Sequence, residues 1–307
     1  MKLATIRYLE NVYAGVLKDE GFYAFSDMDA SLPNDMIAFI EGYDQYKPLV
    51  DEKLEKTTPT CSAAQAQFLS PIPKPRTFRD FLSFEEHTLN CGKAFKCSDE
   101  MTQQLMAVWR SFPGFYFSNP NSFYGQDEPI KMHPASKMFD CEFEIGIIIG
   151  KKGIDIAPDE AKDYIFGLTI LNDWSARDIQ AKEAPLQLGP AKGKDYASTM
   201  GPCIVTMDEL AKYQVPGDDK RYDMTTRLYR NGDLIRENNT KSIYHTYAAL
   251  VEHASRATAI YPGEVFGSGT IGGGAMLEYC GAQPFLSQGE VLEMEIEGIG
   301  KLKMTIE

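Results

Sequence analysis

The sequence of this 307-residue chain predicts an α+β fold that is rich in β-strand. Segments typical of strands outnumber those typical of helices, and the two kinds do not alternate regularly as they do in a doubly wound fold. Three prolines within five residues, Pro71, Pro73 and Pro75, interrupt regular structure. We therefore expect a small N-terminal domain over residues 1–70 and a larger domain over residues 76–307.

The N-terminal region contains three predicted strands and one predicted helix. Short runs of apolar and β-branched residues predict strands over residues 2–8, 11–17 and 21–25. Residues 35–55 predict a helix, with apolar residues on one side near its start. We assign these elements to the small N-terminal domain.

The larger region contains two predicted strands, two short helical segments and a terminal hairpin. In chain order they are a mostly buried, isoleucine-rich strand (141–149), a short helix (158–164), a second strand (165–171), the start of a helix (173–182) and a β-hairpin with arms over 290–297 and 301–306. Gly298 and Gly300 lie where the two arms of the hairpin are joined. No internal repeat interrupts this order.

Composition and charge exclude several classes of partner. The chain has 31 Lys and Arg residues and 44 Asp and Glu residues, which give a formal net charge of −13. It contains no Lys/Arg-rich run and no basic helix face, so nucleic acid and anionic membranes are poor partners. An acidic protein that binds an acidic substrate must concentrate local positive charge, either from Arg and Lys side chains or from a metal ion.

The cysteines and the N-terminal residues bear on the cellular compartment. Six cysteines are scattered without a CxxC pair, which is typical of reduced cytosolic thiols and not of a disulfide framework or a zinc site. Arg7 and Glu10 interrupt the N-terminal apolar residues, so no signal peptide is predicted. No window approaches the roughly 20 apolar residues that span a bilayer. We therefore expect a cytoplasmic protein.

Two glutamates in an apolar segment are the first candidates for chemistry. Glu142 and Glu144 lie within residues 139–147, and side chains two positions apart on a strand point to the same face. Adjacent buried carboxylates repel each other and are costly to desolvate, and a divalent cation would offset both effects. A solvated strand face is the alternative, although the flanking isoleucines favour burial.

A second segment, NDWSARDIQ over residues 172–180, adds a further acid. Asp173 would supply a third oxygen ligand, with Arg177 and Gln180 about one helical turn apart and facing a substrate. Alternatively, Asp173 caps a helix and pairs with Arg177 four residues later. Ligation by oxygen atoms alone would indicate Mg²⁺, Mn²⁺ or Ca²⁺ and not zinc.

Only four histidines are available to act as a base. They are His87, His133, His245 and His253, and a purely structural histidine is the alternative for each of them. A glycine-rich string, GSGTIG over residues 267–272, matches the GxGxxG pattern of dinucleotide-binding folds. It lacks a following βαβ unit and a suitable acidic partner, so we do not predict nucleotide binding.

Taken together, residues 76–307 resemble the fumarylacetoacetate hydrolase family. Five strings carry the resemblance: RDFLSFEEH (79–87), FDCEFEIG (139–146), NDWSARDIQ (172–180), LGPAKGKD (188–195) and GSGTIGGGAMLEY (267–279). The second string is similar to the E-x-E metal strand of the family, and the first has its Asp-to-His spacing of seven residues. The resemblance implies a small N-terminal domain followed by a mixed β-sandwich roll that usually forms a homodimer.

The resemblance also implies roles for individual residues. The implied ligands of a divalent metal, Mg²⁺ or Mn²⁺ with Ca²⁺ as an alternative, are Asp80, Glu142, Glu144 and Asp173. The implied general base and the residue that orients it are His87 and Glu278. The residues implied to stabilise developing negative charge are Arg177, Gln180 and Lys194. The residues implied to contact the substrate are Tyr116, Lys96 and Thr270.

Three positions depart from the family pattern. The true fumarylacetoacetate hydrolases place substrate-contacting tyrosines where this chain has Leu82 and Ala184. An arginine nine residues after the base is replaced by Lys96, which keeps the charge but loses bidentate geometry. The sequence therefore supports the metal site better than it supports the identity of the substrate. We expect a preference for a small acylpyruvate-type acid over fumarylacetoacetate.

We predict a metal-dependent hydrolase that cleaves a carbon–carbon bond in a small acylpyruvate or 1,3-diketo acid, in the aromatic catabolism that the resemblance implies. Decarboxylation of oxaloacetate and isomerisation of a dienoic diacid are alternatives that would use the same site. Retention of His87 and Glu278 favours activation of water, which decarboxylation does not need. A metal-binding protein without turnover is the alternative from another class. The expected partners are a small 2-oxo acid and a second copy of the chain.

Overall fold

The computed structural model describes all 307 residues, and most of its strands belong to one large mixed sheet. The strands of this sheet are β1 (Lys2–Tyr8), β2 (Asn11–Lys18), β3 (Gly21–Ala24), β4 (Cys61–Ser62), β5 (Gln67–Phe68), β6 (Phe78–Phe81), β7 (Phe115–Ser118), β8 (Phe123–Tyr124), β10 (Phe143–Ile149), β11 (Ile165–Asp173), β13 (Ser198–Thr206) and β18 (Val265–Gly267). They lie in the order β4-β3-β2-β1-β13-β11-β10-β18-β6-β7, with β5 beside β1 and β8 beside β13. The predicted α+β class, rich in strand, is confirmed.

A second sheet of four strands packs against one face of the large sheet. In spatial order its strands are β17 (Asp233–Asn239), β16 (Thr225–Arg230), β19 (Val291–Ile296) and β20 (Gly300–Thr305). The predicted C-terminal hairpin is confirmed, because β19 pairs with β20 and Ile296 lies opposite Gly300. The remaining strands form two short pairs, β9 (Phe139–Asp140) with β12 (Ser175–Ala176) and β14 (Gln214–Val215) with β15 (Asp218–Tyr222).

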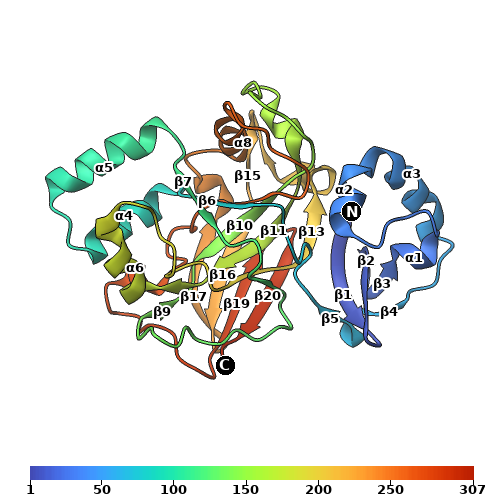
Figure 1. Ribbon diagram of the computed structural model, residues 1–307, viewed down its shortest axis with the longest axis horizontal. Coiled ribbons are helices and arrows are strands. Elements are labelled where there is room, and N and C mark those ends of the chain that lie inside the picture. The colour runs from blue at the N-terminus through green and yellow to red at the C-terminus, as the bar shows by residue number, and fades with distance from the viewer.

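Eight α-helices surround the sheets. They are α1 (Phe25–Met28), α2 (Met36–Glu41), α3 (Tyr43–Leu54), α4 (Glu85–Ala94), α5 (Asp99–Ser111), α6 (Arg177–Glu183), α7 (Met207–Leu210) and α8 (Tyr247–Ser255). Figure 1 places α1, α2 and α3 at one end of the longest axis of the molecule, and α4, α5 and α6 at the other end. The helix predicted over residues 158–164 is only a 3₁₀ turn over Ala161–Tyr164. No helix combines the length and the apolar character that crossing a membrane requires.

The helix predicted over residues 35–55 is interrupted and forms two helices. α2 begins after Asp35, whose carboxylate accepts a hydrogen bond from the Ala38 amide at 2.8 Å. Gly42 separates α2 from α3, and its φ of −100° and ψ of 18° depart from regular helical values. The low helix propensity of glycine accounts for the interruption at this residue.

The N-terminal strands extend the same sheet that contains the central strands. β1 pairs antiparallel with β13, with Lys2 opposite Val205 and Leu3 opposite Ile204. Figure 1 shows the N-terminal strands on the α1–α3 side of the molecule, next to β13. The division of the chain into domains at residues 70–76 stays a prediction.

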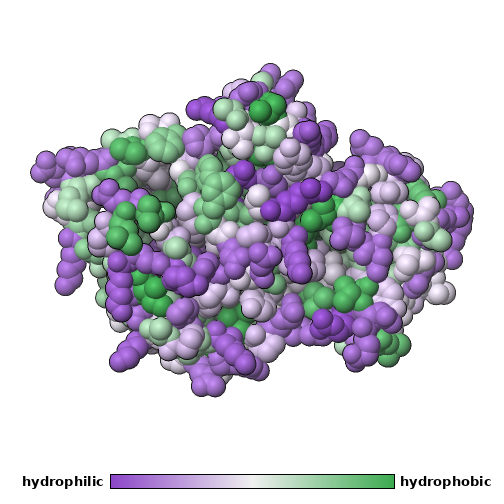
Figure 2. Space-filling view, viewed as in Figure 1, coloured by the Kyte–Doolittle hydropathy of each residue, from purple (hydrophilic) through white to green (hydrophobic).

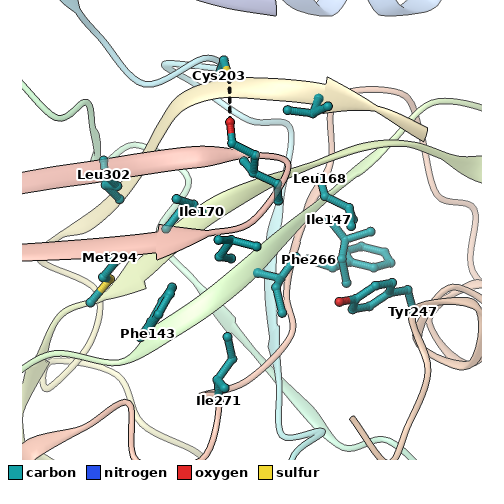
Figure 3. Close-up of a cluster of buried hydrophobic side chains, with 14 of the residues drawn as sticks. Phe143, Ile147, Leu168, Ile170, Cys203, Tyr247, Phe266, Ile271, Met294 and Leu302 are labelled. Atoms are coloured by element: carbon teal, nitrogen blue, oxygen red, sulfur yellow. Dashed lines mark hydrogen bonds between the residues drawn. The ribbon is translucent and has the colours of Figure 1, made fainter. Parts of the chain in front are cut away.

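The central strand β10 is buried on both of its faces. Ile147 belongs to the core between the two sheets, together with Leu168 and Met294 (Figure 3). Ile148 points the other way, into a second core that it shares with Phe166 and the helices of the N-terminal region. A strand that is buried on both faces has a continuous apolar sequence and no alternation. This double burial explains the isoleucine-rich segment.

Three predicted element boundaries near the acidic residues are wrong. The strand predicted over residues 141–149 begins at Phe143, so Glu142 precedes β10. β11 continues to Asp173, two residues beyond its predicted end. The helix predicted to start at that aspartate begins only at Arg177, because residues 175 and 176 form β12 and pair with β9.

Replacing Ile147 by alanine should lower the free energy of unfolding by about 2–5 kcal/mol, because a fully buried side chain is lost and a cavity remains. Urea denaturation followed by circular dichroism measures this change. Ile154→Ala is the matched control. Ile154 is 56% exposed, and its replacement should change stability by less than about 0.5 kcal/mol. Equal losses in the two variants would contradict the central position of Ile147.

Candidate active site

Three neighbouring strands bring two acidic side chains to one point in the large sheet. β18 lies between β6 and β10, and Gly267 of β18 lies opposite Asp80 on one side and opposite Gly146 on the other. A Cβ atom on Gly267 would lie 2.4 Å from Asp80 Oδ1 and 2.7 Å from Glu144 Oε2. Glycine at this position therefore leaves the space in which the two carboxylates meet.

Asp80, Glu142 and Glu144 form a buried acidic group, which we call the carboxylate cluster. One oxygen atom of each residue lies within 4.8 Å of the others, and all three residues are buried. Burial raises the pKa of Asp80 and of Glu144 well above the usual range, and the neighbouring carboxylates raise both further. Burial acts in the same direction on Glu142, but Lys194 and Arg177 outweigh it and lower the pKa of that carboxyl.

Glu142 reaches the carboxylate cluster from a loop, which corrects the predicted arrangement of two glutamates on one strand face. Only Glu144 belongs to β10. The Glu142 amide donates to Asn172 Oδ1 at 2.9 Å, and the Asp173 amide donates to the Glu142 carbonyl at 3.1 Å. Asn172 therefore holds this loop against the end of β11. Its role was not predicted, although it opens the NDWSARDIQ string.

Asp173 lies beside the carboxylate cluster at the end of β11. Lys194 Nζ donates to Asp173 Oδ2 at 2.6 Å and also pairs with Glu142. The alternative in which Asp173 caps a helix is wrong, because Ala176 occupies the N-cap of α6 and no side chain bonds there. Asp173 also does not pair with Arg177, which is engaged elsewhere.

Tyr116 of β7 contacts the acids directly. Its hydroxyl lies 2.5 Å from Asp173 Oδ2 and 2.8 Å from Asp80 Oδ2. A hydroxyl has one hydrogen to donate, so Tyr116 satisfies one of these two carboxylates at a time. Its predicted contact with a substrate stays a prediction, whereas its contact with the acids was not anticipated.

Three carboxylate oxygens at this point have no hydrogen-bond partner although they are buried. They are Asp80 Oδ1, Glu144 Oε1 and Asp173 Oδ1. A buried polar group without a partner costs about 1–3 kcal/mol, and more when it is charged. Carboxylate oxygens are the ligands that Mg²⁺, Mn²⁺ and Ca²⁺ prefer. The residues present therefore fit a hard divalent cation.

His87 and Glu278 form a hydrogen-bonded pair next to the carboxylate cluster. His87 Nδ1 lies 2.8 Å from Glu278 Oε1, and His87 Nε2 lies 3.9 Å from Glu142 Oε1. Glu278 Oε2 accepts hydrogen bonds from the Gly273 amide at 2.7 Å and from Asn90 Nδ2 at 3.1 Å. Burial alone would raise the pKa of Glu278, but His87 and these donors outweigh it and lower the pKa. The carboxylate is therefore fixed and ready to orient the imidazole.

Arg177 begins α6 and is buried among acids. Its Nε donates to Asp140 Oδ2 at 2.8 Å, and its Nη1 pairs with Glu142 Oε1 at 2.7 Å. Nη1 also donates to Gln180 Oε1 at 3.1 Å, whereas Nη2 has no partner. Asp140 was not among the predicted site residues. The position of Asp140 in the apolar FDCEFEIG string could have indicated its role, because a buried aspartate requires a cation or several hydrogen-bond donors as partners.

Most of the predicted site residues line one cavity of about 520 Å³. Those that line it are Asp80, His87, Tyr116, Glu142, Glu144, Arg177, Gln180, Lys194 and Thr270. Asp173 and Glu278 lie directly behind this lining, in contact with Lys194 and His87. Lys96 is exposed and outside the lining, so the structure does not bring it to the predicted substrate contact. It follows the end of α4 with a left-handed φ of 54°.

Comparison with a protein-family model decides the family. The model described as the C-terminal part of fumarylacetoacetate (FAA) hydrolase matches residues 76–307, which is most of the chain. The chain belongs to the fumarylacetoacetate hydrolase family. The resemblance carried by the five sequence strings is therefore confirmed.

Proteins that resemble this chain are named for different reactions. An oxaloacetate tautomerase of Xenopus laevis is 28% identical over 274 residues, which cover 89% of this chain and 79% of the relative. Human fumarylacetoacetase is 29% identical over 72% of this chain and 63% of its own length. A maleylpyruvate hydrolase from Sphingobium sp. SYK-6, crystallised with manganese(II) and pyruvate, shares the fold with a TM-score of 0.74 at 19% identity, over 100% of this chain and 98% of that chain. Family membership alone therefore does not fix the reaction.

Replacing Gly267 by alanine should weaken Mn²⁺ binding by about tenfold or more, because the added Cβ displaces the carboxylates of Asp80 and Glu144. Isothermal titration calorimetry of the folded variant measures the affinity. Gly92→Ala is the matched control, since its Cβ would meet only Thr102 Oγ1 at an ordinary 3.7 Å. Unchanged Mn²⁺ affinity in Gly267→Ala would show that the two carboxylates do not meet at a metal there.

Proposed function

We propose that the protein is a divalent-metal-dependent hydrolase that cleaves a carbon–carbon bond in a small acylpyruvate or 1,3-diketo acid. The observation that carries this proposal is the position of His87. Its Nδ1 contacts Glu278, and its Nε2 lies 3.9 Å from Glu142 Oε1 at the lining of the cavity. An oriented base beside an acidic metal-binding group suits activation of water for attack on a carbonyl carbon.

Four acids would hold the cation, with Mg²⁺ or Mn²⁺ as the expected ion: Asp80, Glu142, Glu144 and Asp173. The three unpartnered carboxylate oxygens support this assignment. The manganese(II) bound to a maleylpyruvate hydrolase of the same fold supports Mn²⁺ as one expected ion. When bound, the cation would act as a Lewis acid on the 2-oxo and enol oxygens of the substrate.

His87 would take a proton from water through Nε2. Glu278 would accept a hydrogen bond from the Nδ1–H group, so that the lone pair of Nε2, which lies 3.5 Å from Cys91 Sγ, would act as the base. The resulting hydroxide would form a bond to the distal carbonyl carbon, and the adjacent carbon–carbon bond would break. Its electron pair would stay on the leaving carbon, which would then receive a proton, with His87 placed to return it.

Donors at the charged end of the cavity would stabilise the oxyanion formed by this attack. Arg177 Nη2 and Thr270 Oγ1 are buried and have no hydrogen-bond partner. Lys194 and Gln180 line the same cavity. Fixed donors in a buried site stabilise developing charge more strongly than water does, because they need no reorganisation.

A second candidate function is tautomerisation of a 2-oxo acid. Similarity to the oxaloacetate tautomerase over 89% of the chain favours it. The imidazole of His87 would then move a proton between carbon and oxygen without attack by water. Decarboxylation of oxaloacetate and isomerisation of a dienoic diacid would use the same site. Formation of two acids from one acylpyruvate separates hydrolysis from all three of these reactions.

An assay of acetylpyruvate hydrolysis tests the proposal. The loss of the enol absorbance of acetylpyruvate measures the rate. Protein from which EDTA has removed the metal should not hydrolyse acetylpyruvate, and added Mn²⁺ or Mg²⁺ should restore activity. His87→Ala should lower kcat by about 100-fold or more, because a positioned base contributes roughly 10²–10⁴ to the rate. Mn²⁺ affinity should stay nearly unchanged in this variant.

His133→Ala is the control, because His133 lies outside this cavity. It should leave kcat unaltered. Normal hydrolysis by His87→Ala, or full activity in metal-free protein, would refute the proposal. Tautomerisation of oxaloacetate without cleavage of any acylpyruvate would put the second candidate in its place.

A further inference from the structure

The lining of the cavity contains a charged group of residues, which we call the charged end, and an apolar group. Its charged lining residues all belong to the site described above: Asp80, His87, Glu142, Glu144, Arg177 and Lys194. Another part of the lining, which we call the apolar wall, comes from the residue after β6, the residue after α4, and α5 with the residue that follows it. The apolar wall consists of Leu82, Phe95, Leu105, Val108, Trp109 and Phe112.

The apolar wall offers a substrate no strong hydrogen-bond donor. The Trp109 Nε1–H group donates to the Leu82 carbonyl at 2.6 Å. Thr88, which lines the cavity nearby, donates its hydroxyl to a backbone carbonyl one turn earlier at 3.1 Å. The remaining polar side chains of this region are the thiols of Cys91 and Cys97, which are weak hydrogen-bonding groups.

The apolar wall also lacks a cation. Arg177 and Lys194 are the only lysine or arginine side chains in the cavity lining, and both lie at the charged end. Lys96 lies outside the lining, and Arg110 of α5 pairs with Glu85 at 3.1 Å on the surface. A second carboxylate placed against the apolar wall would therefore lose part of its hydration without gaining a partner.

We propose that the substrate is a monocarboxylate, namely an acylpyruvate whose acyl group is an alkyl chain or an aryl ring that packs against the apolar wall. This inference rests on the proposed function for the position of the 2-oxo acid group at the charged end. The unpartnered donors Arg177 Nη2 and Thr270 Oγ1 lie at that end. The cavity of about 520 Å³ lies within the range of roughly 300–1,000 Å³ typical of small-molecule sites.

Apolar area is available on the wall for such an acyl group. Leu105, Val108 and Phe112 are 45%, 57% and 42% exposed. Figure 2 shows apolar side chains gathered on the side of the molecule where Figure 1 places α4, α5 and α6. Each methylene that is fully buried should raise affinity about fourfold, and about twofold where the wall is half exposed. This preference would set the chain apart from relatives named for oxaloacetate and maleylpyruvate, which are dicarboxylates.

Binding of two 2-oxo acids of equal chain length, 2-oxooctanoate and 2-oxooctanedioate, tests the inference. Neither has the 1,3-dicarbonyl group that hydrolysis requires, so their binding does not depend on turnover. Isothermal titration calorimetry of the full-length protein with Mn²⁺ should show that 2-oxooctanoate binds about tenfold or more tightly, because the diacid buries a charge without a partner. Pyruvate should bind more weakly than 2-oxooctanoate.

Leu105→Arg places a cation on the apolar wall and should remove most of this preference. Leu105 is partly exposed, so the variant should fold. Met101→Arg is the matched control, because Met101 lies one turn earlier on α5, is 58% exposed and does not line the cavity. It should bind both acids as the unaltered protein does.

Equal or tighter binding of 2-oxooctanedioate by the unaltered protein would overturn the inference. A Leu105→Arg variant that changes the oligomeric state in light scattering, but keeps the preference, would overturn it too, since the wall would then contact a second copy of the chain. A preference for 2-oxooctanoate without cleavage of any acylpyruvate would sink the proposed hydrolysis and leave this inference standing. Cleavage of acylpyruvates together with a preference for the diacid would overturn this inference and leave the proposed hydrolysis standing.

Discussion

The structure depends on holding four carboxylates in one buried site: Asp80, Glu142, Glu144 and Asp173. Two unit charges no more than 4.8 Å apart, as in the carboxylate cluster, repel each other by at least about 3–4 kcal/mol at an effective dielectric constant of about 20. Lys194 and Arg177 offset part of this repulsion through their pairs with Glu142. Three oxygens still lack a partner, so a divalent cation is the group that would complete the charge balance.

The fold meets this constraint through the pairing of β6 with β18. The two strands run parallel, and Gly267 lies opposite Asp80. Because they are parallel, both strands end on the same side of the sheet. The segment after β6 supplies His87 from α4, and the segment after β18 supplies Glu278 from the 3₁₀ turn η6 (Met276–Tyr279). One strand pairing therefore sets the distance between an acid of the carboxylate cluster and the base beside it.

Local patterns predicted much of the fold, and the family resemblance predicted most of the site residues. Continuous apolar runs predicted β10 and β11, and the joined arms at the C-terminus predicted the hairpin, because burial and turn chemistry act over a few residues. The loop position of Glu142 and the pairing of Arg177 with Asp140 depend on contacts between distant segments, which a local pattern does not contain. Lys96 lies outside the cavity lining and has a left-handed φ, which the sequence around it did not indicate. The roles of the site residues stay proposals.

A crystal structure of the protein soaked in Mn²⁺, with anomalous diffraction data, tests the central claim most directly. We expect one strong anomalous peak within coordination distance of Asp80 and Glu144, on the side of the oxygens that lack partners. Glu142 and Asp173 should complete the ligand set, with Lys194 Nζ displaced from at least one of them. Absence of a peak at this position at millimolar Mn²⁺, with Lys194 still bonded to both acids, would contradict the account.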